Sequence, residues 1–353
     1  METTPLVPST PTRAAKQLES ETSSDQYFEK LRPVFTPFIH QYPHYSIYET
    51  VKVVIFSVTV FPIRFITSLV ILVSLWIALL PATLFNTQRR LVKLYIRLFA
   101  TILLKTLLAV NGFVFFKRLY DPSPENPGKH RRRGKRRVVN ATIVVNHVSW
   151  VDIVYFAGEI FPSFIAKAEV SRIPFIGKIA KSANCLFVNR SDPNSRQLIS
   201  SSMNERMSDE SKSSLLIFPQ GCTSDSSHIT QFQLGAFRPA KPVQPVVLCY
   251  EYKRGNPSWD TAHFLYVFWR CACQFYNKVS VLYLPLYHPS EEEQANPRLF
   301  ADNVRHEMAK AGGLRAVESG YREKRIYEEV LFGKISSREA NSILEIERQA
   351  RVV

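Results

Sequence analysis

The sequence predicts an α/β domain, a mixed sheet with flanking helices, preceded by an N-terminal membrane-anchoring helical segment. Two observations predict this organisation. From about residue 138 onward, short β-branched runs bounded by turn residues alternate with longer runs of helical character. Before them lies an uncharged run of 21 residues, Phe65 to Phe85, which is long enough to cross the hydrocarbon core of a bilayer. A chain of 353 residues therefore divides into a main domain with appendages.

Composition divides the chain into five segments. Residues 1–26 are polar and rich in Ser, Thr and Pro, and we expect them to be disordered. The segments expected after this tail are membrane-anchoring and interfacial helices at 27–116, a polybasic loop at 117–137, the α/β domain at 138–315 and a C-terminal helical tail at 316–353.

The apolar run from Phe65 to Phe85 is interpreted as the anchor. Residues 53–63 are also apolar, and Arg64 separates the two runs. A single span is one interpretation, and a re-entrant hairpin that enters and leaves one leaflet is another. The core helix of a soluble domain would have the same length and composition.

Cationic residues follow the anchor. In a second apolar stretch, residues 91–116, the side chains of Lys93, Arg97 and Lys105 fall near one helix face, which favours a helix lying in the membrane interface. Residues 129–137 (KHRRRGKRR) then carry seven cations, which indicates a cytosolic loop attracted to anionic lipid. A solvated loop or a localisation tag is the alternative interpretation of this loop.

The charge of the whole chain limits its partners. It has 45 Lys and Arg against 30 Asp and Glu, a net charge of +15, so we expect nucleic acid, an anionic membrane surface or phosphorylated substrates. No aromatic-rich groove motif accompanies the basic loop, which disfavours nucleic acid. The five cysteines form neither a CxxC pair nor an even framework, so we expect neither a zinc site nor structural disulfides.

Within the α/β domain, alternating patterns predict six strands and four helices. The expected strands are residues 140–145, 163–166, 184–189, 214–218, 243–250 and 279–284. The expected helices are residues 149–159, 194–207, 261–276 and 298–311. A surface helix is expected at 337–351 in the tail.

One strand end carries the candidate catalytic pair. The buried run Thr142 to Val145 breaks at Asn146-His147, where an α/β sheet presents reactive groups. Asp152 follows His147 by five residues, about a turn and a half along a helix, close enough to fold back onto the imidazole. A carboxylate on one nitrogen fixes the tautomer and makes the other nitrogen more basic, which equips it to deprotonate a hydroxyl. A capping aspartate beside a hydrogen-bonded core histidine is the alternative.

Three further blocks follow in the same domain. Lys167 follows the strand expected at 163–166, and the next expected strand ends on Arg190, whose guanidinium can grip a phosphate bidentately or form a structural ion pair. Phe218-Pro219-Gln220-Gly221-Cys222-Thr223 forms a turn after a strand, where backbone N–H groups and hydroxyls can meet a phosphate or glycerol. Pro245 lies inside a buried strand, which argues for an edge strand or a bulge beside a site.

Four strand-end motifs in this order resemble the glycerolipid acyltransferase family, whose signatures are NHxxxxD, a block ending in Arg, FPEG and a final strand with Pro. The resemblance covers about residues 138–333. Details further along resemble the lysophosphatidylcholine and lysophosphatidylethanolamine acyltransferase branch: Phe232, Gly235-Ala236-Phe237, the run from Pro242 to Val247 and the run from Tyr287 to Glu293. Lys324-Arg325-Ile326-Tyr327 looks like the plant-type lysophosphatidylethanolamine enzymes.

This resemblance implies a reaction. His147 would deprotonate the free hydroxyl of a lysophospholipid, which attacks an acyl-CoA thioester, and Asp152 would orient the imidazole. Arg190 would bind the acceptor's phosphate, and Pro245 would shape the acceptor or acyl pocket. The residues implied to bind substrate also include Asn146, Lys167, Phe218, Pro219, Gln220, Gly221 and Thr223. Transfer is direct, with acyl-CoA as co-substrate and with no other cofactor and no metal.

One position departs from the family pattern. Gln220 stands where FPEG has glutamate, so a role that needs a carboxylate is lost. A lysophosphatidic acid acyltransferase and a catalytically silent, membrane-tethered lipid- or CoA-binding protein are therefore kept as alternatives. The expected location is the endoplasmic reticulum membrane with the catalytic domain facing the cytosol, since both substrates partition to a bilayer surface.

Overall fold

The computed structural model of the chain describes residues 25–42, 46–84, 90–120, 141–173, 177, 180–181, 185–188, 215–251 and 254–352. Several expectations lie outside these residues: most of the expected disordered tail, the basic run at 129–137, the helix at 194–207 and the position of Arg190. The five-segment division of the chain stays a prediction.

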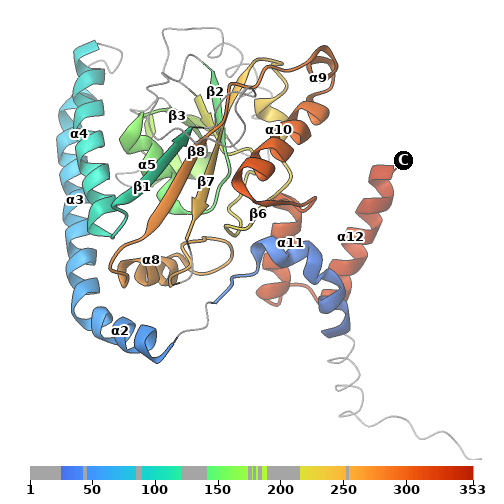
Figure 1. Ribbon diagram of the computed structural model, residues 1–353, viewed down its shortest axis with the longest axis horizontal. Helices are drawn as coiled ribbons and strands as arrows, with labels where there is room; N and C mark the ends of the chain where they lie inside the picture. The colour runs from blue at the N-terminus through green and yellow to red at the C-terminus, as the bar shows by residue number, and fades with distance from the viewer. Residues whose placement is uncertain are drawn as a thin grey trace, which may run out of the picture.

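A seven-stranded mixed sheet forms the centre of the molecule (Figure 1). Its order is β1 (Phe115–Tyr120), β8 (Lys278–Tyr283), β7 (Val243–Tyr250), β2 (Thr142–Val145), β5 (Leu215–Ile217), β3 (Ser163–Lys167) and β4 (Leu186–Val188). The β7–β8 pair is antiparallel and the other neighbours are parallel. The predicted α/β class with a mixed sheet is confirmed. A second, two-stranded sheet pairs β6 (His228–Ile229) with β9 (Arg315–Ala316).

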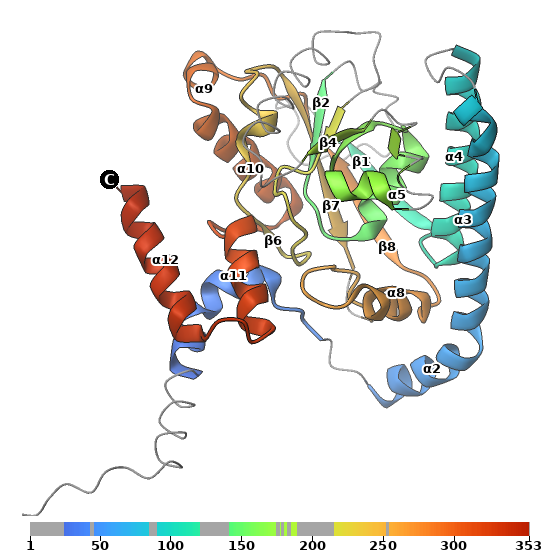
Figure 2. The ribbon, with the colours of Figure 1, turned by 180° about the vertical axis from the view of Figure 1, so that it is seen from behind.

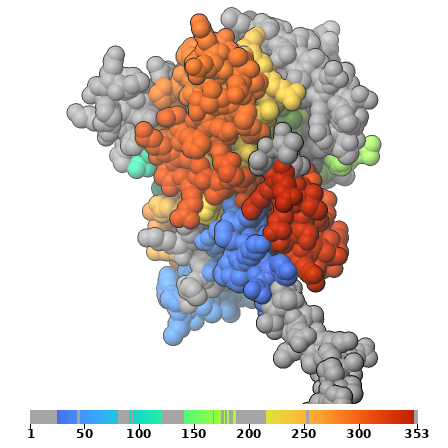
Figure 3. Space-filling model, turned by 90° about the vertical axis from the view of Figure 1, so that its right-hand side faces the viewer, coloured from blue at the N-terminus to red at the C-terminus, as the bar shows by residue number. Residues whose placement is uncertain are grey.

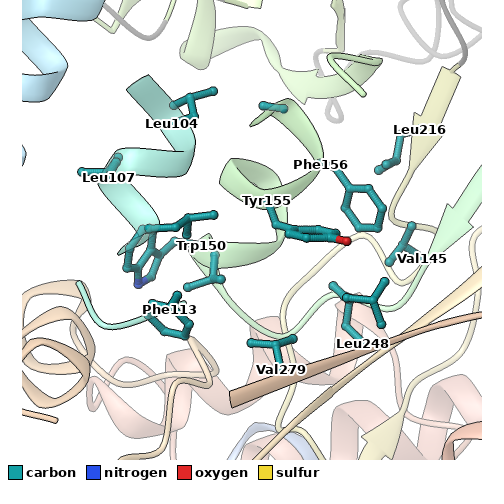
Figure 4. Packing of buried hydrophobic residues seen from close by; sticks show 14 of the residues in the cluster. Leu104, Leu107, Phe113, Val145, Trp150, Tyr155, Phe156, Leu216, Leu248 and Val279 are labelled. Carbon is teal, nitrogen blue, oxygen red and sulfur yellow. The ribbon is translucent and has the colours of Figure 1, made fainter. Parts of the chain in front are cut away.

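The central strand β2 explains why the sheet has two covered faces. All four of its residues are buried, as in parallel strands with helices on both sides. Ile143 and Val145 point into one hydrophobic cluster with α5 (Trp150–Glu159) and α8 (Phe264–Ala272). Val144 points into a second cluster with α10 (Pro297–Gly312). Figure 4 shows the first cluster, in which Tyr155 and Phe156 of α5 pack beside Val145 and Leu248, and Trp150 lies beside Phe113.

One strand was missed, and the structure decides between the two alternatives expected for another. The structure adds β1, whose sequence FFKRLY falls where we expected interfacial helix and basic loop, and pairs it with β8 at one side of the sheet. The strand that contains Pro245 is not at an edge, because β7 lies between β8 and β2. Its partners on the β8 side are Tyr287 for Val243 and Tyr283 for Val246. Two residues of β7, Pro245 among them, therefore face three of the other strand, which is a β-bulge.

Helices α2 (Ile47–Val58), α3 (Val60–Leu84) and α4 (Arg90–Val110) line one side of the sheet domain. Both ribbon views show α3 and α4 side by side along its flank (Figures 1 and 2). Ile71, Leu75 and Leu79 of α3 recur every four residues and are buried in the first cluster. Residues 60–80 of α3 form a helix long and apolar enough to cross a membrane.

Polar contacts fix these helices to the domain. The Arg64 guanidinium donates to the carbonyls of Ala272 (2.8 Å) and Gln274 (2.6 Å) at the C-terminal end of α8, where backbone carbonyls lack helical partners. The Lys105 ammonium of α4 lies 3.1 Å from the Glu159 carboxylate of α5. Arg64, the cation that interrupts the apolar run in the sequence, therefore connects α3 to the sheet domain.

Both ends of the described chain meet in one layer. We call it the terminal layer: the helix over residues 25–35, η1 (Thr36–Phe38), α11 (Tyr321–Leu331) and α12 (Ser337–Val352). These elements share a hydrophobic cluster of their own, built from Leu31, Phe35, Phe38, Ile326, Tyr327, Ala340 and Leu344. Figure 3 shows the N-terminal and C-terminal segments, blue and red, packed side by side. The remaining short elements are η2 (Ala168–Arg172), η3 (Leu234–Ala236) and α9 (Glu291–Ala295).

Candidate functional site

The carboxyl ends of four parallel strands form the edge that carries the candidate site. Val144 of β2 is level with Ile217 of β5, so His147 and Gln220, each three residues further along, are adjacent. β3 ends at the same edge on Lys167, which is level with Val188, the last residue of β4. The strand register thus brings together the loops in which the sequence places its candidate residues.

His147 and Asp152 are in contact. His147 Nδ1 lies 2.8 Å from Asp152 Oδ2, which also accepts the backbone N–H of Val148 (2.7 Å) and of Ser149 (2.9 Å). Asp152 is fully buried in the first turn of α5, where the helix dipole favours a negative charge. The His147 side chain keeps 15% of its surface exposed. With Nδ1 held by the carboxylate, Nε2 is the nitrogen that a substrate hydroxyl would meet.

Tyr250, the last residue of β7, completes the surroundings of Asp152 and was not predicted. Its hydroxyl donates a hydrogen bond to Asp152 Oδ1. Burial, and then the negative charge of Asp152, raise the pKa of the Tyr250 phenol well above its ordinary value of 10, so the phenol remains a donor. Local sequence carries no signal of this contact, because 98 residues separate the two side chains.

The turn after β5 lies against the imidazole. The Phe218 ring stacks on the His147 ring with centroids 4.1 Å apart and an interplanar angle of 18°. Pro219 is buried, and Gly221 has a φ of +71°, a conformation that favours glycine. The Gly221 N–H donates to the Phe218 carbonyl at 3.1 Å, which closes the turn. Pro and Gly thus impose the bend that places an aromatic face on the candidate base.

Gln220 holds this turn to the neighbouring strand end. Its side chain is fully buried, and Oε1 accepts the backbone N–H of His147 at 2.7 Å. Nε2 donates to Ser224 Oγ (3.0 Å) and to Thr230 Oγ1 (2.8 Å). Both ends of the amide are therefore engaged inside the protein. Neither Ser224 nor Thr230 was among the predicted residues; their hydroxyls can turn to accept from an amide or to donate to a carboxylate.

Two other candidate side chains also have partners in the protein. Asn146 is buried, and its amide exchanges two hydrogen bonds with the backbone of Leu248 (3.0 and 2.7 Å), which ties β2 to β7. The Thr223 hydroxyl donates to the Trp259 carbonyl and accepts from the Lys324 ammonium at 3.0 Å. Lys324 lies in the tail, where the sequence analysis assigned no site residue.

The remaining candidates differ in where the structure places them. The backbone of Lys167 lies at the edge with His147, and β4, the strand before Arg190, ends at that edge too. Pro245 is level with Val144, three residues before His147, so about 10 Å of strand separates it from the edge. The structure therefore does not bring Pro245 to the strand ends.

The arrangement can take up a proton. A partly exposed imidazole, held by a buried carboxylate at the carboxyl end of a parallel strand, suits general-base chemistry on a hydroxyl. Among the residues that the structure describes, no group of three or more His, Cys, Asp or Glu side chains could hold a metal ion.

Comparison with known proteins gives a family match, two relatives and one solved structure. Residues 127–250 match the family model described as Acyltransferase. A lysophospholipid acyltransferase of Arabidopsis thaliana, LPEAT1, is 38% identical over 60% of this chain and 52% of its own length. A lysophosphatidylcholine acyltransferase of Drosophila melanogaster is 30% identical over 95% of this chain and 62% of its own length. The chain thus spans between about half and three fifths of these curated relatives. The solved 1-acyl-sn-glycerophosphate acyltransferase of Thermotoga maritima aligns with a TM-score of 0.44 and 17% identity over 71% of this chain and 96% of that chain.

Proposed function

We propose that the chain, whose residues 127–250 match the Acyltransferase family model, transfers a fatty acyl group from acyl-CoA to the free hydroxyl of a lysophospholipid. The observation that carries the proposal is the His147–Asp152 pair at the open end of β2. The acceptor class follows from the relatives, which are named for lysophospholipids and lysophosphatidylcholine. Lysophosphatidylethanolamine and lysophosphatidylcholine are the proposed acceptors.

The proposed reaction needs one base and no covalent intermediate. Nε2 of His147 takes the proton of the acceptor hydroxyl while the hydroxyl oxygen forms a bond to the thioester carbonyl carbon. The tetrahedral intermediate collapses by breaking the carbon–sulfur bond, and the departing CoA sulfur takes the proton from the imidazolium. Asp152 stabilises the imidazolium between these two steps and keeps Nδ1 protonated. We assign the acceptor's phosphate to Arg190 and its glycerol to the turn at residues 218–223.

The enzyme is proposed to act on a membrane surface. On α3 the side chains directed away from the sheet domain are apolar and exposed: Ile63, Ile66, Leu69, Val70, Val73 and Ile77. α4 packs on α5, and α3 lies along α4. If α3 crossed the membrane perpendicular to its plane, the sheet domain attached to it would have to enter the bilayer. We therefore propose that α3 lies in the interface with this face in lipid. The endoplasmic reticulum and a cytosolic orientation are proposed with it.

Acyl transfer by membranes that carry the protein tests the function. Labelled oleoyl-CoA is offered with lysophosphatidylethanolamine, lysophosphatidylcholine or lysophosphatidic acid in parallel, and His147→Ala serves as the blank. Transfer to either of the first two acceptors, absent from the blank, is the expected result. Transfer to lysophosphatidic acid alone would correct the acceptor. Binding of acyl-CoA without transfer to any acceptor would replace the proposal by a silent lipid- or CoA-binding protein.

The membrane surface has its own test. The double variant Ile66→Glu/Val70→Glu places two charges on the exposed face of α3, and we expect it to move protein from floated vesicles to the soluble fraction. Arg338→Glu, at an exposed position of the terminal layer, is the control for added acidic charge. Flotation unchanged by the double variant would show that another surface holds the membrane.

A further inference from the structure

A buried cation from the tail touches the turn beside the candidate base. Lys324 lies on α11, and 6% of its surface is exposed. Its ammonium donates to the carbonyl oxygen of Thr223 at 2.9 Å and to Thr223 Oγ1 at 3.0 Å. We propose that Lys324 is a positioning residue that fixes the turn at residues 218–223, and hence the acceptor, relative to His147. This inference rests on the proposed function.

The placement of the ammonium is specific. Burying a cation is costly unless hydrogen bonds compensate for the lost water. A long lysine side chain at an exposed position would keep its head in solvent, with only the aliphatic stem against the protein. Here the head is directed inward, onto two oxygens of a single residue. Such a contact defines the position of the Thr223 backbone, because the carbonyl and the hydroxyl are held together.

Thr223 passes this constraint to the backbone at His147 and Val148. Its hydroxyl donates to the carbonyl of Trp259, and the Trp259 N–H donates to the carbonyl of Val148 at 2.8 Å. The next residue, Ser224, donates its N–H to the carbonyl of His147 at 3.0 Å. The oxygens of Thr223 are thus within two hydrogen bonds of the backbone of His147 and Val148.

The terminal layer keeps Lys324 in place. Tyr327, one turn further along α11, packs on Phe35 with ring centroids 5.1 Å apart. The Ser319 hydroxyl, just before α11, donates to the Val34 carbonyl at 2.7 Å. Cys222, the neighbour of Thr223 in the turn, packs against the hydrophobic cluster of this layer. The tail is therefore part of the wall of the site, and Lys324 is its polar contact with the turn.

The proposal separates binding from chemistry. The Asp152 carboxylate holds the imidazole directly, so proton transfer should survive the loss of the Lys324 ammonium. The turn would lose its fixed position, so Lys324→Met should raise the KM for the lysophospholipid about tenfold, as expected for a lost hydrogen bond to a charged group. The KM for acyl-CoA and kcat should change much less. Methionine keeps an unbranched apolar side chain in the buried space.

Three variants and one chemical probe test this expectation. Lys324→Arg keeps donors that can reach both oxygens and should restore most of the acceptor affinity. Thr223→Val removes one of the two acceptors and should give a smaller change in the same direction. Lys334→Met changes an exposed lysine just after α11 and is the matched control. Alkylation of Cys222 by iodoacetamide, followed by mass spectrometry with Cys249 as internal reference, reports on the turn without requiring activity.

The outcomes distinguish this inference from the proposed function. If wild-type protein transfers no acyl group, the proposed function fails. Faster Cys222 alkylation in Lys324→Met would still support the role of Lys324 in fixing the turn at residues 218–223. If wild-type protein is active and Lys324→Met has an unchanged acceptor KM and an unchanged alkylation rate, the inference is overturned. An equal loss of kcat with every acceptor and no rescue by arginine would assign Lys324 to folding alone and overturn it as well.

Discussion

Among the residues that the structure describes, three histidines lie against a buried aspartate, and two of these pairs, in different regions of the molecule, differ in what surrounds the ring. At the end of β2, His147 Nδ1 lies 2.8 Å from Asp152. Near the terminal layer, His40 Nδ1 lies 2.9 Å from Asp260 in the loop before α8. The two carboxylates are similar too, since both are fully buried at the side chain and both accept backbone N–H groups.

The surroundings separate the two pairs. The His147 side chain is 15% exposed, and its neighbour Phe218 covers one face of the ring. The His40 side chain is 4% exposed, with Tyr42 and Tyr266 packed edge-on at 4.7 and 5.8 Å. His40 joins the N-terminal segment to the loop at Asp260, which are 220 residues apart. The two histidine–aspartate pairs thus have similar geometry but different roles. The more exposed ring of His147 is the candidate base, and the buried ring of His40 forms a structural contact.

The largest expected effect is on His147. His147→Ala should lower acyl transfer by about 10⁴-fold, the upper range for a lost general base, while the protein remains folded, because Asp152 keeps its three other donors. Transfer rates and thermal melting of the same preparation check both halves. Retained transfer would mean that the pair at β2 is structural like its counterpart.

Asp152→Asn is expected to rank second. The amide keeps the size of the carboxylate and an oxygen for backbone N–H groups, but it cannot stabilise the imidazolium or enforce the tautomer, so kcat should fall by about 10³-fold. The equivalent change at the other pair, Asp260→Asn, is the control and should leave kcat near the wild-type value. Similar losses of kcat in both variants would remove the distinction between the regions.

His40→Ala should act on stability instead of catalysis. Removing the ring leaves the buried Asp260 carboxylate without one partner and opens a space beside Tyr266, at a cost of about 2 kcal/mol in the free energy of unfolding. The rate per folded molecule should stay unchanged. Urea unfolding together with active-site titration would detect a catalytic role for His40 if the rate fell more than the folded fraction.

Tyr250→Phe should lower the rate least among the variants at the candidate catalytic pair, about tenfold, because it removes one of four donors to Asp152 and leaves the other three. It also predicts a pH dependence. The raised pKa of the phenol means that the folded state holds this proton more tightly than the unfolded chain. That contribution is complete below pH 10 and is lost as the pH rises toward the folded pKa. The stability difference between wild type and Tyr250→Phe should therefore shrink above pH 10 in urea titrations.

Sequence was sufficient for the parts of the site that are local. His147 and Asp152 are five residues apart, so a strand end followed by a helix start brings them together. The sheet class followed from alternation, and most strands were found because their buried runs are uncharged. β1 was missed because Lys117 and Arg118 stand in it, at one side of the sheet where both are exposed.

The other misses are contacts between distant segments. Tyr250 on Asp152 and Lys324 on Thr223 join residues 98 and 101 positions apart, and their pairing depends on the fold of everything between them. Gln220 departs from the family pattern in a motif that was predicted to bind substrate. Its side-chain amide instead forms hydrogen bonds with the backbone of His147 and with the hydroxyls of Ser224 and Thr230. A motif places a residue at a strand end; whether it faces the substrate or the protein depends on its neighbours in space.

The terminal layer has a consequence for the order of assembly. Strands β2 to β7 can pair once residue 250 has been synthesised, and these contacts are short-range compared with those of the layer. The Ser319 hydroxyl on Val34 closes a loop of 285 residues, and Leu31 packs in one cluster with Leu344. Contacts between residues so far apart in the sequence form late, because the chain must first lose the entropy of closing a long loop. During synthesis, the segment that carries His147 and Asp152 can therefore fold before the helices α11 and α12 leave the ribosome and complete the terminal layer.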